Sequence, residues 1–165
     1  MAPDFFDLGY LSRGSAIQRR GFSAITTCGV MNMLKGFDPV VVGTLPLDLF
    51  TDKSDIDIIC YYSDIEKFRA LFHHSKIKML NGVQSAIANF DYDSFEFEIV
   101  GQPIPVSEQV AYRHMVIEWD ILSTNGKDFK DKIISLKNGG MKTEPAFAQM
   151  LNLEGDPYEA LLNYL

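Results

Sequence analysis

The chain has 165 residues, of which 47% are hydrophobic and 22% charged, and its formal net charge is −7. These values are typical of one globular domain with a sizeable core, and no apolar run is long enough to cross a membrane. The acidic charge argues against broad, sequence-independent binding to nucleic acid, which requires a cationic surface. The N-terminal segment mixes acids and bases with apolar residues, unlike a signal peptide, so we expect a cytoplasmic protein.

The first third of the sequence predicts a helix followed by two strands. Ser15 is a good N-cap for a helix that we expect to run to about Lys35. The apolar run 40–42 predicts a buried strand, and residues 55–61 predict a second one. A polar loop that begins at Gly43 joins them.

The middle of the chain predicts mostly strands. Ser63-Asp64-Ile65-Glu66 has the pattern of a capping box and predicts a helix to about His74. Asn81-Gly82 is a common hairpin turn, and it predicts antiparallel strands on its two sides. The expected strands cover residues 77–80, 83–92 and 94–100, and the glycine and prolines of 101–105 predict an irregular boundary.

The last third predicts helices, which we expect over residues 106–122 and 129–136, from near Pro145, and from Asp156-Pro157 onward. The whole order favours an α+β fold, with a mixed β-sheet, helices packed on it and a C-terminal helical segment. We expect a single domain over 1–165, with the sheet core and N-terminal helices in 1–102 and a helical subdomain in 103–165.

Two aspartates two residues apart are the most informative feature of the sequence. Asp55 and Asp57 share one face of the second strand, between apolar residues that indicate burial. Two neighbouring anions are unfavourable unless a cation neutralises them. Hard oxygen ligands suit Mg²⁺ or Mn²⁺, so this strand predicts a divalent metal site.

A third carboxylate is expected from the strand 94–100. Glu96 and Glu98 share one of its faces, and a third acid from a neighbouring strand would complete a two-metal site. We prefer Glu98 because it lies nearer the end of the strand, but Glu96 has the same parity. One of them could be the ligand and the other solvated, or both could belong to a solvated face.

Phosphate contacts are expected from the loop that precedes the aspartates. Gly43 allows close approach of the backbone, and the Thr44 and Ser54 hydroxyls would touch phosphate. Arg113 could make a bidentate phosphate contact, and Lys142 could act as a point charge. The alternative is that both are ordinary solvated side chains.

The helix from residue 106 also pairs Gln109 with Arg113, and His114 with Glu118, at a spacing of four residues. These are either two surface pairs or contacts to the substrate. The loop acids Asp48 and Asp52 are expected to be exposed.

The arrangement resembles the nucleotidyltransferase superfamily, whose best-known member is DNA polymerase beta. The resemblance rests on Val42-Gly43-Thr44, a gap of about ten residues, and Asp55-Ile56-Asp57-Ile58. The superfamily usually has glycine or serine where this chain has Thr44. The resemblance implies a nucleotidyltransferase-like fold with a metal site formed by Asp55, Asp57 and a later acid.

A closer resemblance covers almost the whole chain. It is to a small bacterial family of uncharacterised proteins, a domain of unknown function with a nucleotidyltransferase-like fold. It rests on the segments 43–47, 54–60, 109–115 with Glu118, and 142–148. The last two segments imply no established role.

The preferred function is therefore a Mg²⁺- or Mn²⁺-dependent nucleotidyltransferase. It would move a nucleotidyl group from a nucleoside triphosphate to a small-molecule or protein acceptor, without an extended nucleic acid or a membrane as partner. Asp55, Asp57 and Glu98 would hold the metal. The alternatives are a non-catalytic member of the same fold that binds a nucleotide or a partner, and a metal-dependent phosphohydrolase.

Overall fold

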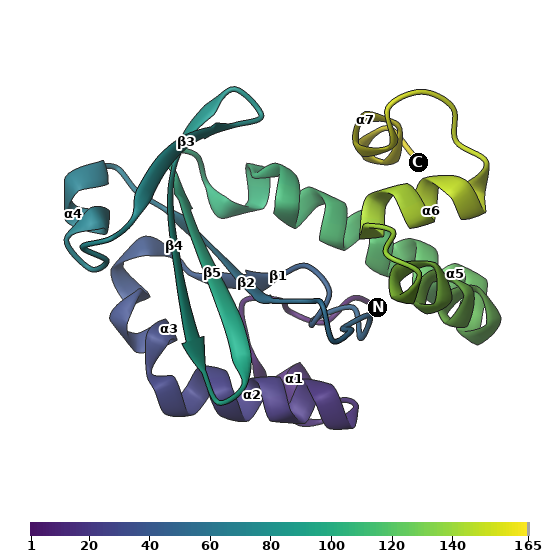
Figure 1. The fold of residues 1–165 in the computed structure, drawn as a ribbon, viewed down its shortest axis with the longest axis horizontal. Coiled ribbons are helices and arrows are strands. Elements are labelled where there is room, and N and C mark those ends of the chain that lie inside the picture. The colour runs from purple at the N-terminus through teal and green to yellow at the C-terminus, as the bar shows by residue number, and fades with distance from the viewer. Residues whose placement is uncertain (165) are drawn as a thin grey trace.

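Five strands form one mixed sheet in the computed structural model, which describes residues 1–164 (Figure 1). The strand order is β1-β2-β5-β4-β3, and β2 and β5 are parallel while the other neighbours are antiparallel. The strands are β1 (Val40–Val42), β2 (Ile56–Tyr61), β3 (Lys76–Leu80), β4 (Val83–Tyr92) and β5 (Phe95–Gln102). With the helices described below, this confirms the predicted α+β class.

The N-terminal helices pack against one face of this sheet. They are α1 (Gly9–Ser12), α2 (Ala16–Cys28), α3 (Val30–Met33) and the 3-10 helix η1 (Lys35–Phe37). Ser15 caps α2 through a capping box with Gln18, as the sequence predicts for its N-cap. The prediction that this helix reaches Lys35 is wrong, because the left-handed backbone of Gly29 ends α2.

The short helix α4 (Ile65–Arg69) begins one residue later than the predicted capping box. Asp64, rather than Ser63, is its N-cap, since the Asp64 carboxylate accepts a hydrogen bond from the backbone N–H of Glu66. The helix was expected to reach His74, but tight turns with three-residue spacing replace it after Arg69.

The hairpin between β3 and β4 turns at Asn81-Gly82, as predicted. The irregular segment predicted from Gly101 is wrong at its start, because β5 continues through Gly101 to Gln102. Gly101 pairs with Ala86 and Cys60 on its two sides, and a Cβ atom there would lie 2.8 Å from the Phe68 ring. The glycine thus lets an aromatic ring pack directly on the strand.

The C-terminal third contains the 3-10 helix η2 (Val106–Glu108) and the helices α5 (Val110–Asn138), α6 (Thr143–Leu151) and α7 (Pro157–Leu162). The two helices predicted over 106–122 and 129–136 correspond to the two arms of α5, which meet at the non-helical backbone of Gly126. The predicted start at residue 106 is wrong, because 106–108 form η2 and Gln109 has an extended backbone before α5 begins. Asp156 caps α7 and Pro157 is its first residue, as the sequence predicts.

Two hydrophobic clusters follow from the alternation of side chains along the strands. Val41 and Ile58 face a cluster with α1, α2, α3 and α4, whereas Val40, Val42 and Ile59 face a cluster with α5, α6 and α7. The sheet therefore lies between two sets of helices, seen in purple to blue and in green to yellow in Figure 1. Within residues 1–164, no helix has the length and apolar character needed to cross a bilayer.

Candidate functional site

Three carboxylates meet where β2 and β5 lie side by side. Asp57 is the register partner of Glu98 across the parallel pair, and Asp55 lies two residues before Asp57. One oxygen from each of the three lies within 4.8 Å of the other two, and all three side chains are partly buried. Glu96 is exposed and lies outside this group. Of the two glutamates offered by the sequence, the structure brings Glu98 to the aspartates.

The cluster holds excess negative charge. Burial, together with the charges of Asp55, Glu98 and Glu144 and against the charge of Lys137, raises the pKa of Asp57 to about 8. A pKa raised in this way favours the protonated form of Asp57 when no cation is bound. Three converging carboxylate oxygens form the hard donor set that Mg²⁺ or Mn²⁺ prefers, so these residues fit such an ion.

Gly43 places the loop after β1 directly against this carboxylate cluster. Its backbone is left-handed, with φ of 76°, and a Cβ atom built on it would lie 2.5 Å from Asp57 Oδ2. A side chain at this position would meet both backbone strain and a steric clash. Glycine thus lets the loop backbone lie close to the face of β2 that carries the carboxylate cluster.

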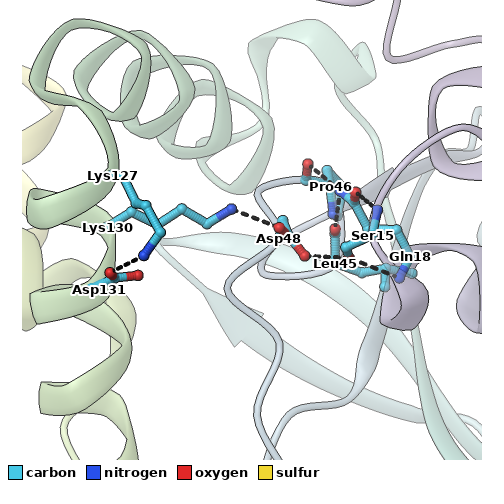
Figure 2. Close-up of polar contacts among 8 residues, drawn as sticks. All are labelled: Ser15, Gln18, Leu45, Pro46, Asp48, Lys127, Lys130 and Asp131. Atoms are coloured by element: carbon cyan, nitrogen blue, oxygen red, sulfur yellow. Dashed lines mark hydrogen bonds and ion pairs between the residues drawn. The ribbon is translucent and has the colours of Figure 1, made fainter.

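Gln18 of α2 anchors the same loop through its side-chain amide. Its side-chain amide donates hydrogen bonds to the carbonyls of Leu45 at 3.0 Å and Pro46 at 3.1 Å (Figure 2). Both acceptors are in the turns that follow Gly43 and Thr44. Gln18, which caps α2 together with Ser15, therefore also stabilises the backbone of the loop.

Asp48 anchors the loop through two further contacts, one to the N-cap of α2 and one to α5. Its carboxylate accepts a hydrogen bond from the Ser15 hydroxyl and pairs with Lys130 Nζ at 2.6 Å (Figure 2). The expectation that Asp48 is exposed is wrong, because these two partners leave its side chain 31% exposed. Asp52, in the same loop, is exposed as expected.

A cavity of about 670 Å³ opens above the carboxylate cluster. The loop after β1, the strands β2 and β5 and the helices α5, α6 and α7 all contribute to its wall. Of the residues predicted from the sequence, the following line it: Gly43, Thr44, Ser54, Asp55, Asp57, Glu98 and Lys142.

Two of the predicted phosphate contacts, Arg113 and Ser54, differ from the expectation in the structure. Arg113 is exposed on α5 and lies outside the cavity wall, so the structure does not bring it to the cluster. Ser54 lines the cavity, but its hydroxyl accepts a hydrogen bond from the backbone N–H of Thr51 and helps to close a turn. In the structure, Ser54 therefore stabilises the turn in this loop.

The helical wall of the cavity contributes five further titratable residues, of which the sequence indicates only the His114–Glu118 pair, either as a surface pair or as contacts to the substrate. The five are Lys137 at the end of α5, His114 and Glu118 in its first arm, Glu144 in α6 and Tyr158 in α7. The four-residue spacing of His114 and Glu118 was a signal for a shared face. Nothing in the local pattern indicated which side of the helix would face the cavity.

The charge of Lys137 acts to lower the pKa values of both Asp57 and Glu118. Burial lowers the pKa of Lys137 itself, whereas Glu144, Glu118, Asp57 and Asp55 raise it through their charges. Its ammonium group donates a hydrogen bond to the Thr143 hydroxyl at 2.7 Å. Lys137 thus brings positive charge to the side of the cavity that faces the carboxylate cluster.

Comparison with protein families gives one match. The model of a family described as a domain of unknown function, DUF4269, matches residues 23–164. No curated protein matches the chain.

Solved structures show the same fold at low sequence identity. A GLD-2/RNP-8 complex matches with a TM-score of 0.55, 12% identity and coverage of 87% of this chain and 60% of that one. The Cid1 poly(U) polymerase with Mg 3′-dATP bound matches with a TM-score of 0.52, 11% identity and coverage of 93% and 52%.

The polymerase core of TRAMP, an RNA surveillance complex, matches with a TM-score of 0.51, 14% identity and coverage of 93% and 50%. This chain spans only 50–60% of the length of the three matched structures. At these identities the likeness shows the fold, which is nucleotidyltransferase-like, as the sequence resemblance implied.

Proposed function

This chain belongs to the DUF4269 family, and we propose that it is a metal-dependent nucleotidyltransferase. The single observation that carries this proposal is the carboxylate cluster of Asp55, Asp57 and Glu98, which faces a cavity on a nucleotidyltransferase-like fold. The reaction would transfer a nucleotidyl group from a nucleoside triphosphate to an acceptor and release pyrophosphate.

The three carboxylates would hold Mg²⁺ or Mn²⁺. When bound, the metal would neutralise the charges of the attacking and leaving oxygens. Asp57 would release its proton to become a ligand, since its pKa is raised to about 8 in the free protein. Glu98 would complete the ligand set from the neighbouring strand and could help to deprotonate the acceptor.

The triphosphate would lie along the loop after β1 and between the lysines of the cavity. Gly43 brings the loop backbone close to Asp57, and Thr44 adds a hydroxyl to the same wall. Lys142 and Lys137 line the cavity and supply positive charge for the phosphates. The protein would accelerate the reaction mainly by positioning and charge neutralisation.

The acceptor class follows from charge. The net charge of −7 disfavours a long nucleic acid, so we propose a small molecule or a protein as acceptor. The matched Cid1 structure with Mg 3′-dATP concerns a poly(U) polymerase, and TRAMP is an RNA surveillance complex. An RNA oligonucleotide therefore belongs in any panel of acceptors as a direct comparison.

The test is pyrophosphate release by the wild-type chain over the four ribonucleoside triphosphates with Mg²⁺ or Mn²⁺. Small hydroxyl compounds, a protein extract and an RNA oligonucleotide serve as acceptors. Asp57→Asn should abolish release, whereas Glu96→Gln, on the same strand as Glu98 but exposed, should leave it unchanged. Equal release by wild type and Asp57→Asn would contradict the proposal.

The same assay separates the alternative functions. A phosphohydrolase would release inorganic phosphate without an acceptor. A non-catalytic member of the fold would bind nucleotide in a metal-dependent manner, measured by calorimetry, but would release neither product with any acceptor. Either outcome would replace the proposed transferase activity while leaving the metal site in place.

A further inference from the structure

The helical wall of the cavity carries a second acidic group, which we call the Glu118–Glu144 pair. Glu118 lies on α5 and is only 3% exposed, and it lines the cavity. Among residues 1–164, its Oε1 atom is buried without a hydrogen-bond partner. An unpartnered buried carboxyl oxygen is unfavourable in a folded protein, and it usually indicates a missing donor.

His114 does not supply this donor to either glutamate. Its Nε2 atom lies 2.9 Å from the carbonyl oxygen of Tyr158, and because a carbonyl only accepts, this nitrogen carries the hydrogen. In the neutral ring the other nitrogen, Nδ1, is then an acceptor. It faces Glu144 Oε1 at 3.8 Å, which is too far for a hydrogen bond.

Lys137 does not neutralise the pair either. In the described part of the chain, no ion pair joins Lys137 to Glu118 or Glu144, and its ammonium group donates to the Thr143 hydroxyl instead. Its charge acts at longer range on four carboxylates, those of Asp55 and Asp57 included. The cavity as a whole is lined by five acidic side chains and three lysines.

A bound metal and triphosphate would not remove this excess. Divalent cations at the carboxylate cluster and the negative charges of a triphosphate largely cancel one another. The Glu118–Glu144 pair would then remain the dominant charge on the opposite wall. Burial and the charge of Glu144 raise the pKa of Glu118 well above its ordinary range, although the charge of Lys137 opposes the shift.

We propose that Glu118 and Glu144 bind a protonated amine of the acceptor, so that the acceptor is an amine-bearing small molecule; this inference rests on the proposed transferase function. An ammonium group offers three donors to the two carboxylates. Tyr158 adds an aromatic ring to the same wall, and burial, followed by the charges of Glu144 and Asp156, raises the pKa of its hydroxyl. An aromatic ring beside two carboxylates is a suitable environment for a cation.

Paired probes test this inference directly. Glucosamine is compared with N-acetylglucosamine, and putrescine with 1,4-butanediol, by isothermal titration calorimetry at saturating Mg²⁺ and without nucleotide. The metal keeps the carboxylate cluster from competing for the amines. The proteins are wild type, Glu118→Gln, Glu144→Gln and Asp57→Asn, and Glu154→Gln serves as control because Glu154 is exposed outside the cavity wall.

We expect each amine to bind roughly tenfold or more tightly than its uncharged partner, as for a charge paired with a buried carboxylate. Glu118→Gln and Glu144→Gln should remove this preference, and Glu154→Gln should keep it. The thermal unfolding midpoint of Glu118→Gln should equal or exceed that of wild type, because the variant removes an unpaired buried acid. A lost preference then reflects binding rather than misfolding.

Equal binding of charged and uncharged probes to wild type would overturn the inference. The same holds if Glu118→Gln retains the amine preference. Asp57→Asn separates the two proposals, because it should lose pyrophosphate release but keep the amine preference. If the transferase assay fails, the calorimetric result can still be interpreted. If the amine preference is absent, the pyrophosphate-release assay still tests the proposed transferase.

Discussion

Asp48, in the loop that carries Gly43 and Thr44, and Lys130, in the second arm of α5, form an ion pair of 2.6 Å between residues 82 positions apart in sequence (Figure 2). The pair ties the proposed phosphate loop to the helix that forms the opposite wall of the cavity. It is also partly shielded from solvent, since the side chains are 31% and 28% exposed.

Breaking this ion pair should weaken both the fold and nucleotide binding. Lys130→Met should reduce the free energy of unfolding by about 1 kcal/mol, the upper end for pairs of partly exposed side chains. The KM for nucleotide should rise, because the loop loses one of its anchors. Urea unfolding and steady-state kinetics measure the two effects.

Lys127→Met is the matched control, because Lys127 pairs with Asp131 on the exposed face of the same helix. This variant should leave both the urea midpoint and the KM unchanged. If the two lysine variants behave alike, the Asp48–Lys130 pair has no special role in holding the loop.

The two glutamates of β5 should differ sharply in metal binding. Glu98→Gln removes one carboxylate from the cluster and should weaken Mn²⁺ binding by roughly tenfold or more, since affinity depends on the number of charged ligands. Glu96→Gln should bind Mn²⁺ as wild type does. Electron paramagnetic resonance of free Mn²⁺ measures both, and equal affinities would exclude Glu98 as a ligand.

Gly43 and Gly82 offer a second matched pair. Both have positive φ, but a Cβ atom at Gly43 would meet Asp57 Oδ2 at 2.5 Å, whereas nothing lies within 4 Å at Gly82. Gly82→Ala should therefore lose only about 1–2 kcal/mol of stability to backbone strain. Gly43→Ala should lose stability and Mn²⁺ affinity together. Calorimetric titration with Mn²⁺ shows whether the second effect is confined to Gly43.

The stability of the metal-free protein should depend on pH through Asp57. Its pKa rises from 3.8 to about 8 on folding, because of burial and the charges of Asp55, Glu98 and Glu144 against the opposing charge of Lys137. The folded state therefore binds the proton more tightly. This contribution to stability is complete below about pH 3.8 and is lost as pH rises toward about 8.

Thermal unfolding between pH 5 and 9 in a chelator tests this expectation. The midpoint of wild type should fall with pH relative to that of Asp57→Asn, which cannot ionise at this position. Saturating Mg²⁺ should reverse the loss at high pH, because the ion binds the ionised carboxylate and displaces the proton. Parallel curves for wild type and variant would show that Asp57 titrates normally.

Local signals in the sequence were sufficient for most strands and caps. Asn81-Gly82 correctly predicted a hairpin, and Asp156-Pro157 correctly predicted the start of α7. Each pattern determines the conformation of its own stretch of backbone. Gly101 was misjudged as a strand end. Its place inside β5 depends on the Phe68 ring, which packs over it from a distant helix, and no local pattern contains that contact.

The site was predictable only where spacing determines geometry. Asp55 and Asp57 share a face through the two-residue period of a strand. The choice of Glu98 over Glu96 depended on the register between β2 and β5, which the sequence left open. Glu118 and Lys137 reach the cavity because α5 bends at Gly126 and packs beside the sheet, and this tertiary arrangement has no counterpart in local pattern.

The pairing of Asp57 with Glu98 also bears on how the chain folds. A helix and two strands separate β2 from β5, so this parallel contact closes a long loop and should form late, after the local hairpins. A slip of one residue would turn Glu98 to the other face of the sheet. Metal affinity is therefore acquired only with the native register, and a bound ion would selectively slow unfolding of correctly paired chains.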